Sequence, residues 1–69
     1  MNRRQMEKAC KGKIHHLAII HKRDGTKVEA YLQPWDDNAV YLTARDGTSA
    51  GKVALADIVK IDFPEATNA

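Results

Sequence analysis

The last third of the chain limits the possible folds most strongly, because it holds two short apolar segments joined by a tight corner. Both segments lie within residues 51–63, and Ala56-Asp57 forms the corner between them. Upstream, Asp24-Gly25 and Asp46-Gly47 each separate segments rich in β-branched and aromatic residues, a pattern typical of hairpin turns. Five short strands in 69 residues leave room only for a small curled or closed sheet.

The sequence therefore predicts a single domain over residues 1–69 that is all-β apart from one short helix. The helix is predicted over residues 2–11, since this segment has no turn residue and ends at Gly12. The strands are predicted over residues 14–22, 27–33, 39–45, 52–55 and 58–63. Residues 34–38 are predicted to form a loop because they begin with Pro34, and residues 64–69 a frayed tail.

Composition indicates a protein of the cytoplasm. The one cysteine, Cys10, excludes an intramolecular disulfide and fits a reducing compartment. No apolar stretch follows the basic N-terminus, so we expect no secretory signal. The longest apolar run, residues 17–20, is far too short to span a membrane, and we expect no membrane partner.

Charge is distributed unevenly along the chain. Residues 1–27 contain eight basic and two acidic residues, which leaves +6, whereas residues 28–69 contain three basic and seven acidic residues, which leaves −4. A basic front half favours a polyanionic or acidic partner. A solvated basic helix that only aids solubility explains the same asymmetry.

The lengths of the predicted turns fix the strand register. A two-residue loop at Asp24-Gly25, a five-residue loop over residues 34–38 and a six-residue loop over residues 46–51 give one consistent apolar interior. The predicted interior rows are Leu17–Leu32–Val40, Ile19–Ala30–Leu42–Leu55 and His21–Val28–Ala44–Val53. The N-terminal helix is expected to cover the other face of the first strand, at Ile14, Ala18 and Ile20.

The same register predicts a row of four cations on the outer face, Lys22, Lys27, Arg45 and Lys52, which is a candidate site for phosphate groups. Tyr31 and Tyr41 are predicted to be cross-strand neighbours beside it, where aromatic rings can stack on bases. Asp24 and Asp46 could instead neutralise the row, and a tyrosine pair also stabilises a sheet. The candidate nucleic-acid-binding residues are Arg3, Arg4 and Lys8 of the helix, together with Lys22, Lys27, Tyr31, Tyr41, Arg45 and Lys52.

Residues that could support catalysis or metal binding are few. Cys10, His15, His16 and His21 are the only soft ligand types, and they lack the spacing of a zinc site. A Cys10–His15 nucleophile pair would have no third group to orient it. We therefore expect no enzyme, no metal and no cofactor, but a binding protein.

Several segments of the chain resemble the Rof family of Rho-binding antiterminators. They are residues 6–10, 15–17, 22–30, 53–58 and 63–65, so the resemblance covers residues 6–65. It implies an SH3-like or Sm-like barrel of five antiparallel strands with an N-terminal helix, and a role in transcription regulation through contact with the termination factor Rho. The acidic residues that the resemblance implies for this contact are Glu7, which matches the glutamate of the family's helix motif, and Asp36, Asp37 and Asp46.

The segment before the helix motif at residues 6–10 differs from the family pattern, since it reads Asn2-Arg3-Arg4-Gln5 where the family has acidic residues. The alternative is therefore an Sm-like RNA-binding module that uses the basic helix and the cation row. Edge strands of such a small sheet leave both a monomer and a small homo-oligomer open.

Overall fold

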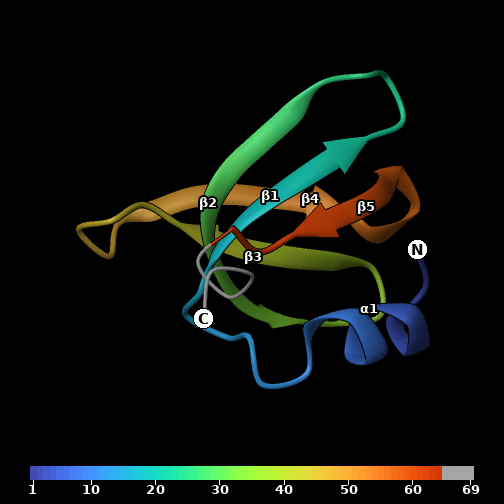
Figure 1. Cartoon of the computed structure of the whole chain (residues 1–69), viewed down its shortest axis with the longest axis horizontal. Coiled ribbons are helices and arrows are strands. Elements are labelled where there is room, and N and C mark those ends of the chain that lie inside the picture. The colour runs from blue at the N-terminus through green and yellow to red at the C-terminus, as the bar shows by residue number, and fades with distance from the viewer. Residues whose placement is uncertain (65–69) are drawn as a thin grey trace.

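The computed structural model of the chain describes residues 1–64, and the end of the predicted frayed tail, residues 65–69, lies outside this part. The described residues form one short helix, five strands and one 3-10 helix (Figure 1). In chain order these elements are α1 (Arg3–Cys10), β1 (Leu17–Lys22), β2 (Lys27–Trp35), β3 (Ala39–Thr43), β4 (Ser49–Ala54), η1 (Leu55–Asp57) and β5 (Ile58–Asp62).

Helix α1 begins with a capping box. The Asn2 side chain accepts a hydrogen bond from the Gln5 amide at 2.9 Å, and the Gln5 side chain accepts one from the Asn2 amide at 2.9 Å. The helix ends before Gly12, whose φ of 73° is left-handed, so the predicted helix is confirmed. Met6 and Cys10, one turn apart, are fully buried, whereas Ala9 is exposed. Across residues 1–64 no helix has the length and apolar character needed to cross a bilayer.

The five strands form one antiparallel sheet, as predicted, but the predicted barrel does not close; the strand order is β4-β3-β2-β1-β5. Within the described residues, β4 and β5 are its two edges and no ladder joins them. The 3-10 helix η1 turns the chain from one edge to the other. The Leu55 amide donates to the Asn38 carbonyl at 2.8 Å, and the Met1 amino group donates to the carbonyls of Leu55 and Ile58 at 2.7 and 3.0 Å. The two edge strands are thus connected by the η1 corner and not by a ladder of hydrogen bonds.

The first hairpin has a three-residue loop, and the predicted two-residue loop is wrong. The Lys22 amide donates to the Thr26 carbonyl at 2.9 Å, and Gly25 adopts a φ of 88°. The Asp24 carboxylate accepts hydrogen bonds from the Thr26 amide and hydroxyl at 2.9 and 2.5 Å, which favours this turn. The register is therefore one residue away from the prediction, with Ala18 opposite Ala30.

The third hairpin repeats this turn with the same four residue types. Arg-Asp-Gly-Thr occurs at residues 23–26 and again at residues 45–48. The Ala44 amide donates to the Thr48 carbonyl at 2.8 Å, and Asp46 accepts from the Thr48 amide at 3.0 Å. The predicted six-residue loop is wrong because this short turn lets β4 begin at Ser49.

The second hairpin differs from its prediction in where the loop begins. Pro34 and Trp35 belong to β2, not to the loop, and the register shifts between Leu32 and Trp35. A proline has no amide hydrogen and is accommodated in a sheet at such a shift. The chain then reverses at Asp36, whose side chain accepts from the amides of Asn38 and Ala39, both at 2.8 Å.

The molecule has one hydrophobic core between the sheet and α1. Strand β1 contributes Ala18 and Ile20, while the predicted interior residues Leu17, Ile19 and His21 are only half-buried. A one-residue change of register exchanges the two faces of a strand, which accounts for this error. Strands β2 and β3 direct the predicted faces toward the core, except that Ala44 is exposed. Ile14, which precedes β1 and was expected under the helix, is also exposed. The buried core residues are Met6, Cys10, Ala18, Ile20, Ala30, Leu32, Val40, Leu42, Val53, Leu55, Ile58 and Phe63.

Candidate functional site

The face of the sheet that points away from the core carries apolar, aromatic, polar and charged side chains, and we call it the outer face. Because side chains alternate along a strand, the buried Ala30, Leu32 and Leu42 place their neighbours on this face. The residues that alternate with them on the three central strands are Leu17 and Ile19 of β1, Glu29, Tyr31 and Gln33 of β2, and Tyr41 and Thr43 of β3.

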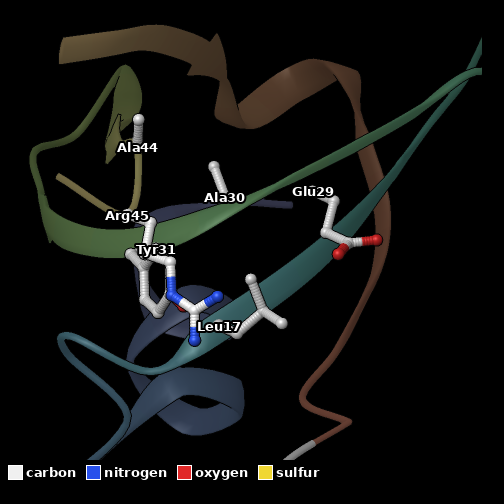
Figure 2. A pocket seen from close by; sticks show the side chains of 6 residues that line it. All are labelled: Leu17, Glu29, Ala30, Tyr31, Ala44 and Arg45. Atoms are coloured by element: carbon white, nitrogen blue, oxygen red, sulfur yellow. The ribbon is translucent and has the colours of Figure 1, made fainter. Parts of the chain in front are cut away.

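Two neighbouring pockets lie around Tyr31, and both are open to solvent. The first has a volume of about 370 Å³ and is lined by Leu17, Glu29, Ala30, Tyr31, Ala44 and Arg45 (Figure 2). The second has a volume of about 360 Å³ and is lined by His15, Tyr31, Gln33, Thr43, Ala44, Arg45 and Gly47. Tyr31, Ala44 and Arg45 line both pockets, so one aromatic ring and one guanidinium group stand between them.

Arg45 occupies the first pocket without a partner. Figure 2 shows its guanidinium group beside the ring of Tyr31, on the side toward Leu17. Within residues 1–64 no hydrogen bond or ion pair engages this group. The equivalent residue of the other Arg-Asp-Gly-Thr turn behaves differently, since Arg23 Nε donates to the Ala56 carbonyl at 2.6 Å. Arg23 of the first turn thus binds to the η1 corner, whereas the guanidinium group of Arg45 in the other turn is available to a ligand.

A short chain of polar side chains lines the second pocket. Gln33 Nε2 donates to Thr43 Oγ1 at 3.1 Å and lies 3.3 Å from His15 Nδ1. His15 reaches this position because its φ is 73°, in a turn where its amide donates to the Leu32 carbonyl at 2.8 Å. If Gln33 donates to Nδ1, the neutral imidazole carries its hydrogen on Nε2.

Tyr41 and Lys52 form a separate polar group on the outer face. The two residues stand opposite each other on β3 and β4. The Tyr41 hydroxyl donates to Asp36 Oδ2 at 3.1 Å, and this hydrogen bond raises the pKa of Tyr41. The pKa of Asp36 is lowered, first by the amide of Asn38, then by that of Ala39. Tyr31 stands opposite Thr43, so the predicted direct pairing of Tyr31 with Tyr41 is wrong.

The predicted row of four cations is also wrong. Lys27 stands opposite His21, Lys52 stands opposite Tyr41, and Arg45 follows the end of β3. The three-residue loop of the first hairpin and the short third turn shift the strand register and so separate these side chains. The residues that do stand side by side at this end of the sheet are Lys60, His21 and Lys27.

Asp62 partly neutralises the observed basic row. His21 Nε2 lies 2.9 Å from Asp62 Oδ2, and Lys60 Nζ lies 3.5 Å from Asp62 Oδ1. The hydrogen bond to His21 is the main cause of the lowered pKa of Asp62. Lys27 and the half-buried Lys22 lie near the first hairpin turn and line neither of the two pockets.

Three of the four acidic residues predicted to contact Rho lie close together. Arg3 Nε lies 3.5 Å from Glu7 Oε1, and Arg3 Nη1 donates to Asp37 Oδ1 at 3.0 Å, which connects α1 with the loop between β2 and β3. Asp36 belongs to the same loop. Asp46 lies in the turn after β3, at the opposite end of that strand (Figure 1). Arg4 and Lys8 are exposed on α1 and line neither pocket.

Cys10 and the histidines are the groups that could support nucleophilic or metal chemistry. Cys10 is fully buried, and desolvation raises the pKa of its thiol to about 11. A thiol with such a pKa is protonated at neutral pH and is a poor nucleophile. In the described part of the chain, no group of three histidine, cysteine or acidic side chains is placed to hold a metal ion.

The sequence predicted Tyr31 and Arg45 as binding residues but did not predict that other side chains line the two pockets with them. These other residues are His15, Leu17, Glu29, Gln33 and Thr43. The repeated Arg-Asp-Gly-Thr sequence is the signal that could have helped to find them, because it indicates that the first and third hairpins share one type of turn. Comparison of the chain with protein-family models, with curated proteins and with solved structures finds no match. The resemblance to the Rof family therefore remains a sequence-based prediction.

Proposed function

We propose that this chain is a non-catalytic binding protein that holds single-stranded RNA on the outer face of β1, β2 and β3. The observation that carries the proposal is the unpaired Arg45 guanidinium beside Tyr31, at the junction of two pockets. Aromatic rings stack on unpaired bases, and arginine binds phosphate through paired hydrogen bonds. Tyr31 is half-buried, which fixes its ring while leaving part of it accessible.

The two pockets fit this ligand better than a flat surface would. They adjoin across Tyr31 and Arg45, so two successive nucleotides could occupy them with the intervening phosphate near Arg45. The second pocket also offers the polar groups of His15, Gln33 and Thr43 to a base edge. Bases in a duplex are stacked and paired, so the proposed ligand is a single strand.

The repeated turn provides a matched pair of variants for the test. Arg45→Ala and Arg23→Ala remove the same side chain from the same tetrapeptide, but only Arg45 lines the pockets. Binding is measured by fluorescence anisotropy with a labelled RNA of about ten nucleotides, within the range that small binding domains cover. The titration is repeated at two salt concentrations.

We expect Arg45→Ala to weaken binding by roughly fivefold or more and to lower the slope of log affinity against log salt by about 0.7. Tyr31→Leu should weaken binding by about tenfold or more, because it removes base stacking. Arg23→Ala should bind nearly as tightly as the unmodified protein. Equal losses for Arg45→Ala and Arg23→Ala would show only a general effect of charge and would contradict the proposed site.

Contact with Rho is a second candidate, supported by the resemblance to the Rof family and by the acidic group formed by Glu7, Asp36 and Asp37. Such a group complements a basic RNA-binding site on a partner protein. A pull-down with purified Rho and a termination assay test it. Replacing Glu7 and Asp37 by Gln and Asn should weaken association, with Asp46→Asn, at the other end of β3, as the comparison. No association at low salt would exclude this candidate.

A further inference from the structure

The first pocket exists because β3 leaves the sheet early. Tyr31 stands opposite Thr43, the last residue of β3. If the same ladder continued, Ala30 would stand opposite Ala44 and Glu29 opposite Arg45. The chain instead turns away, since the Ala44 amide donates to the Thr48 carbonyl at 2.8 Å. The residues of the two missing pairs are four of the six that line the pocket.

The end of this ladder leaves main-chain groups of β2 facing the pocket. The Leu32 amide donates to the His16 carbonyl, and its carbonyl accepts from the His15 amide, so the backbone of Leu32 faces the β1 side. Successive residues of an antiparallel strand face alternate sides. The amide and carbonyl of Tyr31 and Glu29 therefore face the β3 side, where β3 is present beside Tyr31 and absent beside Glu29.

The side chains of the pocket carry opposite charges at two separate places. Figure 2 shows Arg45 beside Tyr31, with the carboxylate of Glu29 farther along β2 and Leu17 between them. Within residues 1–64 neither charged group has an ion-pair partner, and they do not pair with each other. Between them the pocket is lined by Leu17, Ala30 and the ring of Tyr31. A flat ligand with hydrogen-bond donors at one end and an anionic group at the other suits this arrangement.

A carboxylate in a pocket for RNA repels phosphate, so it favours binding only where it accepts hydrogen bonds from a base. Cytosine, adenine and guanine each carry an exocyclic amino group that can donate to a carboxylate. Uracil has the same size as cytosine but carries a carbonyl oxygen in place of the amino group, and this oxygen would face the negative charge of Glu29. The difference between the two pyrimidines therefore isolates the role of this carboxylate.

On the basis of the proposed function above, we propose that Glu29 selects bases with an exocyclic amino group, so that the first pocket prefers cytosine, adenine or guanine over uracil. Tyr31 stacks on the base, Arg45 binds the adjoining phosphate, and the carboxylate of Glu29 accepts the amino hydrogens. The main-chain carbonyl of Glu29, which faces the side where β3 is absent, is a second acceptor at the border of the pocket.

The test compares oligocytidine, oligoadenosine and oligouridine of equal length by the anisotropy titration described above. We expect oligocytidine to bind roughly fivefold more tightly than oligouridine, the effect of one hydrogen bond to an exposed charged group. Glu29→Gln should abolish this preference, since an amide presents either its oxygen or its nitrogen to the base. Oligouridine should then bind more tightly than before, because a repulsive charge is gone.

The matched control is Glu7→Gln, which removes the same charge from α1 and lines neither pocket. It should leave the ratio of cytidine to uridine affinity unchanged. Equal binding of the two strands by the unmodified protein, or a preference that survives Glu29→Gln, would overturn the role of Glu29 while leaving RNA binding intact. Failure of all three strands to bind would overturn the proposed function together with this inference.

Discussion

Replacing Met6 by Ala tests whether α1 belongs to the same core as the sheet. Met6 is fully buried and packs in one cluster with residues of all five strands and η1, although its own helix has only eight residues. A helix of that length is not stable in water by itself, so its docking depends on such contacts. The variant removes three heavy atoms from the core and leaves a cavity.

The expected loss is large relative to the total stability. A buried Met→Ala change costs about 2–5 kcal/mol, and the lower half of that range applies because a short terminal helix can move to fill part of the cavity. A domain of 69 residues has a free energy of unfolding of about 3–10 kcal/mol. The variant should therefore lose about 2–3 kcal/mol, a third or more of a typical total.

Urea unfolding followed by the fluorescence of Trp35 measures this loss, because the chain has one tryptophan and it packs against the core. With a slope of about 1 kcal/mol per molar urea, the midpoint should fall by about 2 M. Lys8→Ala on the exposed side of α1 is the control and should change stability by less than about 0.5 kcal/mol. A Met6→Ala midpoint equal to that of the control would refute a shared core.

Two further predictions follow from the ionisable groups. Hydrogen bonds from Thr26 and Thr48 lower the pKa values of Asp24 and Asp46 below 3.8, so their stabilising contribution is present above that pH and is lost as the pH falls through the folded values. Urea midpoints should therefore decline below pH 3.8, and a variant with Asn at both positions should decline less; equal curves would contradict this. With a pKa of about 11, Cys10 has roughly one thiolate per thousand molecules at pH 8, so a disulfide reagent should react slowly until urea is added. Fast reaction of the native protein would contradict its burial.

The sequence predicted the elements of the fold better than their register. The turn signals at Asp24-Gly25 and Asp46-Gly47 located two hairpins, and Gly12 located the end of α1. An Asp-Gly pair, however, fits both a two-residue loop and a three-residue loop. Hydrogen bonds that the aspartate carboxylate accepts from the amide of the threonine two residues later distinguish the two, and they depend on geometry that residue types alone do not settle.

The face of β1 was difficult to predict for a related reason. Its residues 17–20 are all apolar, so both faces of the strand fit a hydrophobic interior and alternation gives no preference. Only the length of the adjoining loop decides between them. In β2 and β3, by contrast, polar residues alternate with apolar ones, and the predicted interior positions Leu32, Val40 and Leu42 are confirmed.

The candidate site depends directly on this register. With Leu17 and Ile19 facing outward, β1 leaves apolar side chains half-buried on the outer face and places Ala18 and Ile20 in the core. Burial of apolar area stabilises a fold, so an outward-facing Leu17 gains less than an interior one would. In return, Leu17 gives the first pocket an apolar side chain beside Tyr31 and Arg45, which a polar residue at this position would not provide. Leu17→Thr introduces a β-branched residue with high strand propensity while removing much of that apolar contact. If Leu17 serves the pocket rather than the core, this variant should bind RNA more weakly than the unmodified protein at nearly unchanged stability, and a large loss of stability with unchanged binding would place Leu17 in the core instead.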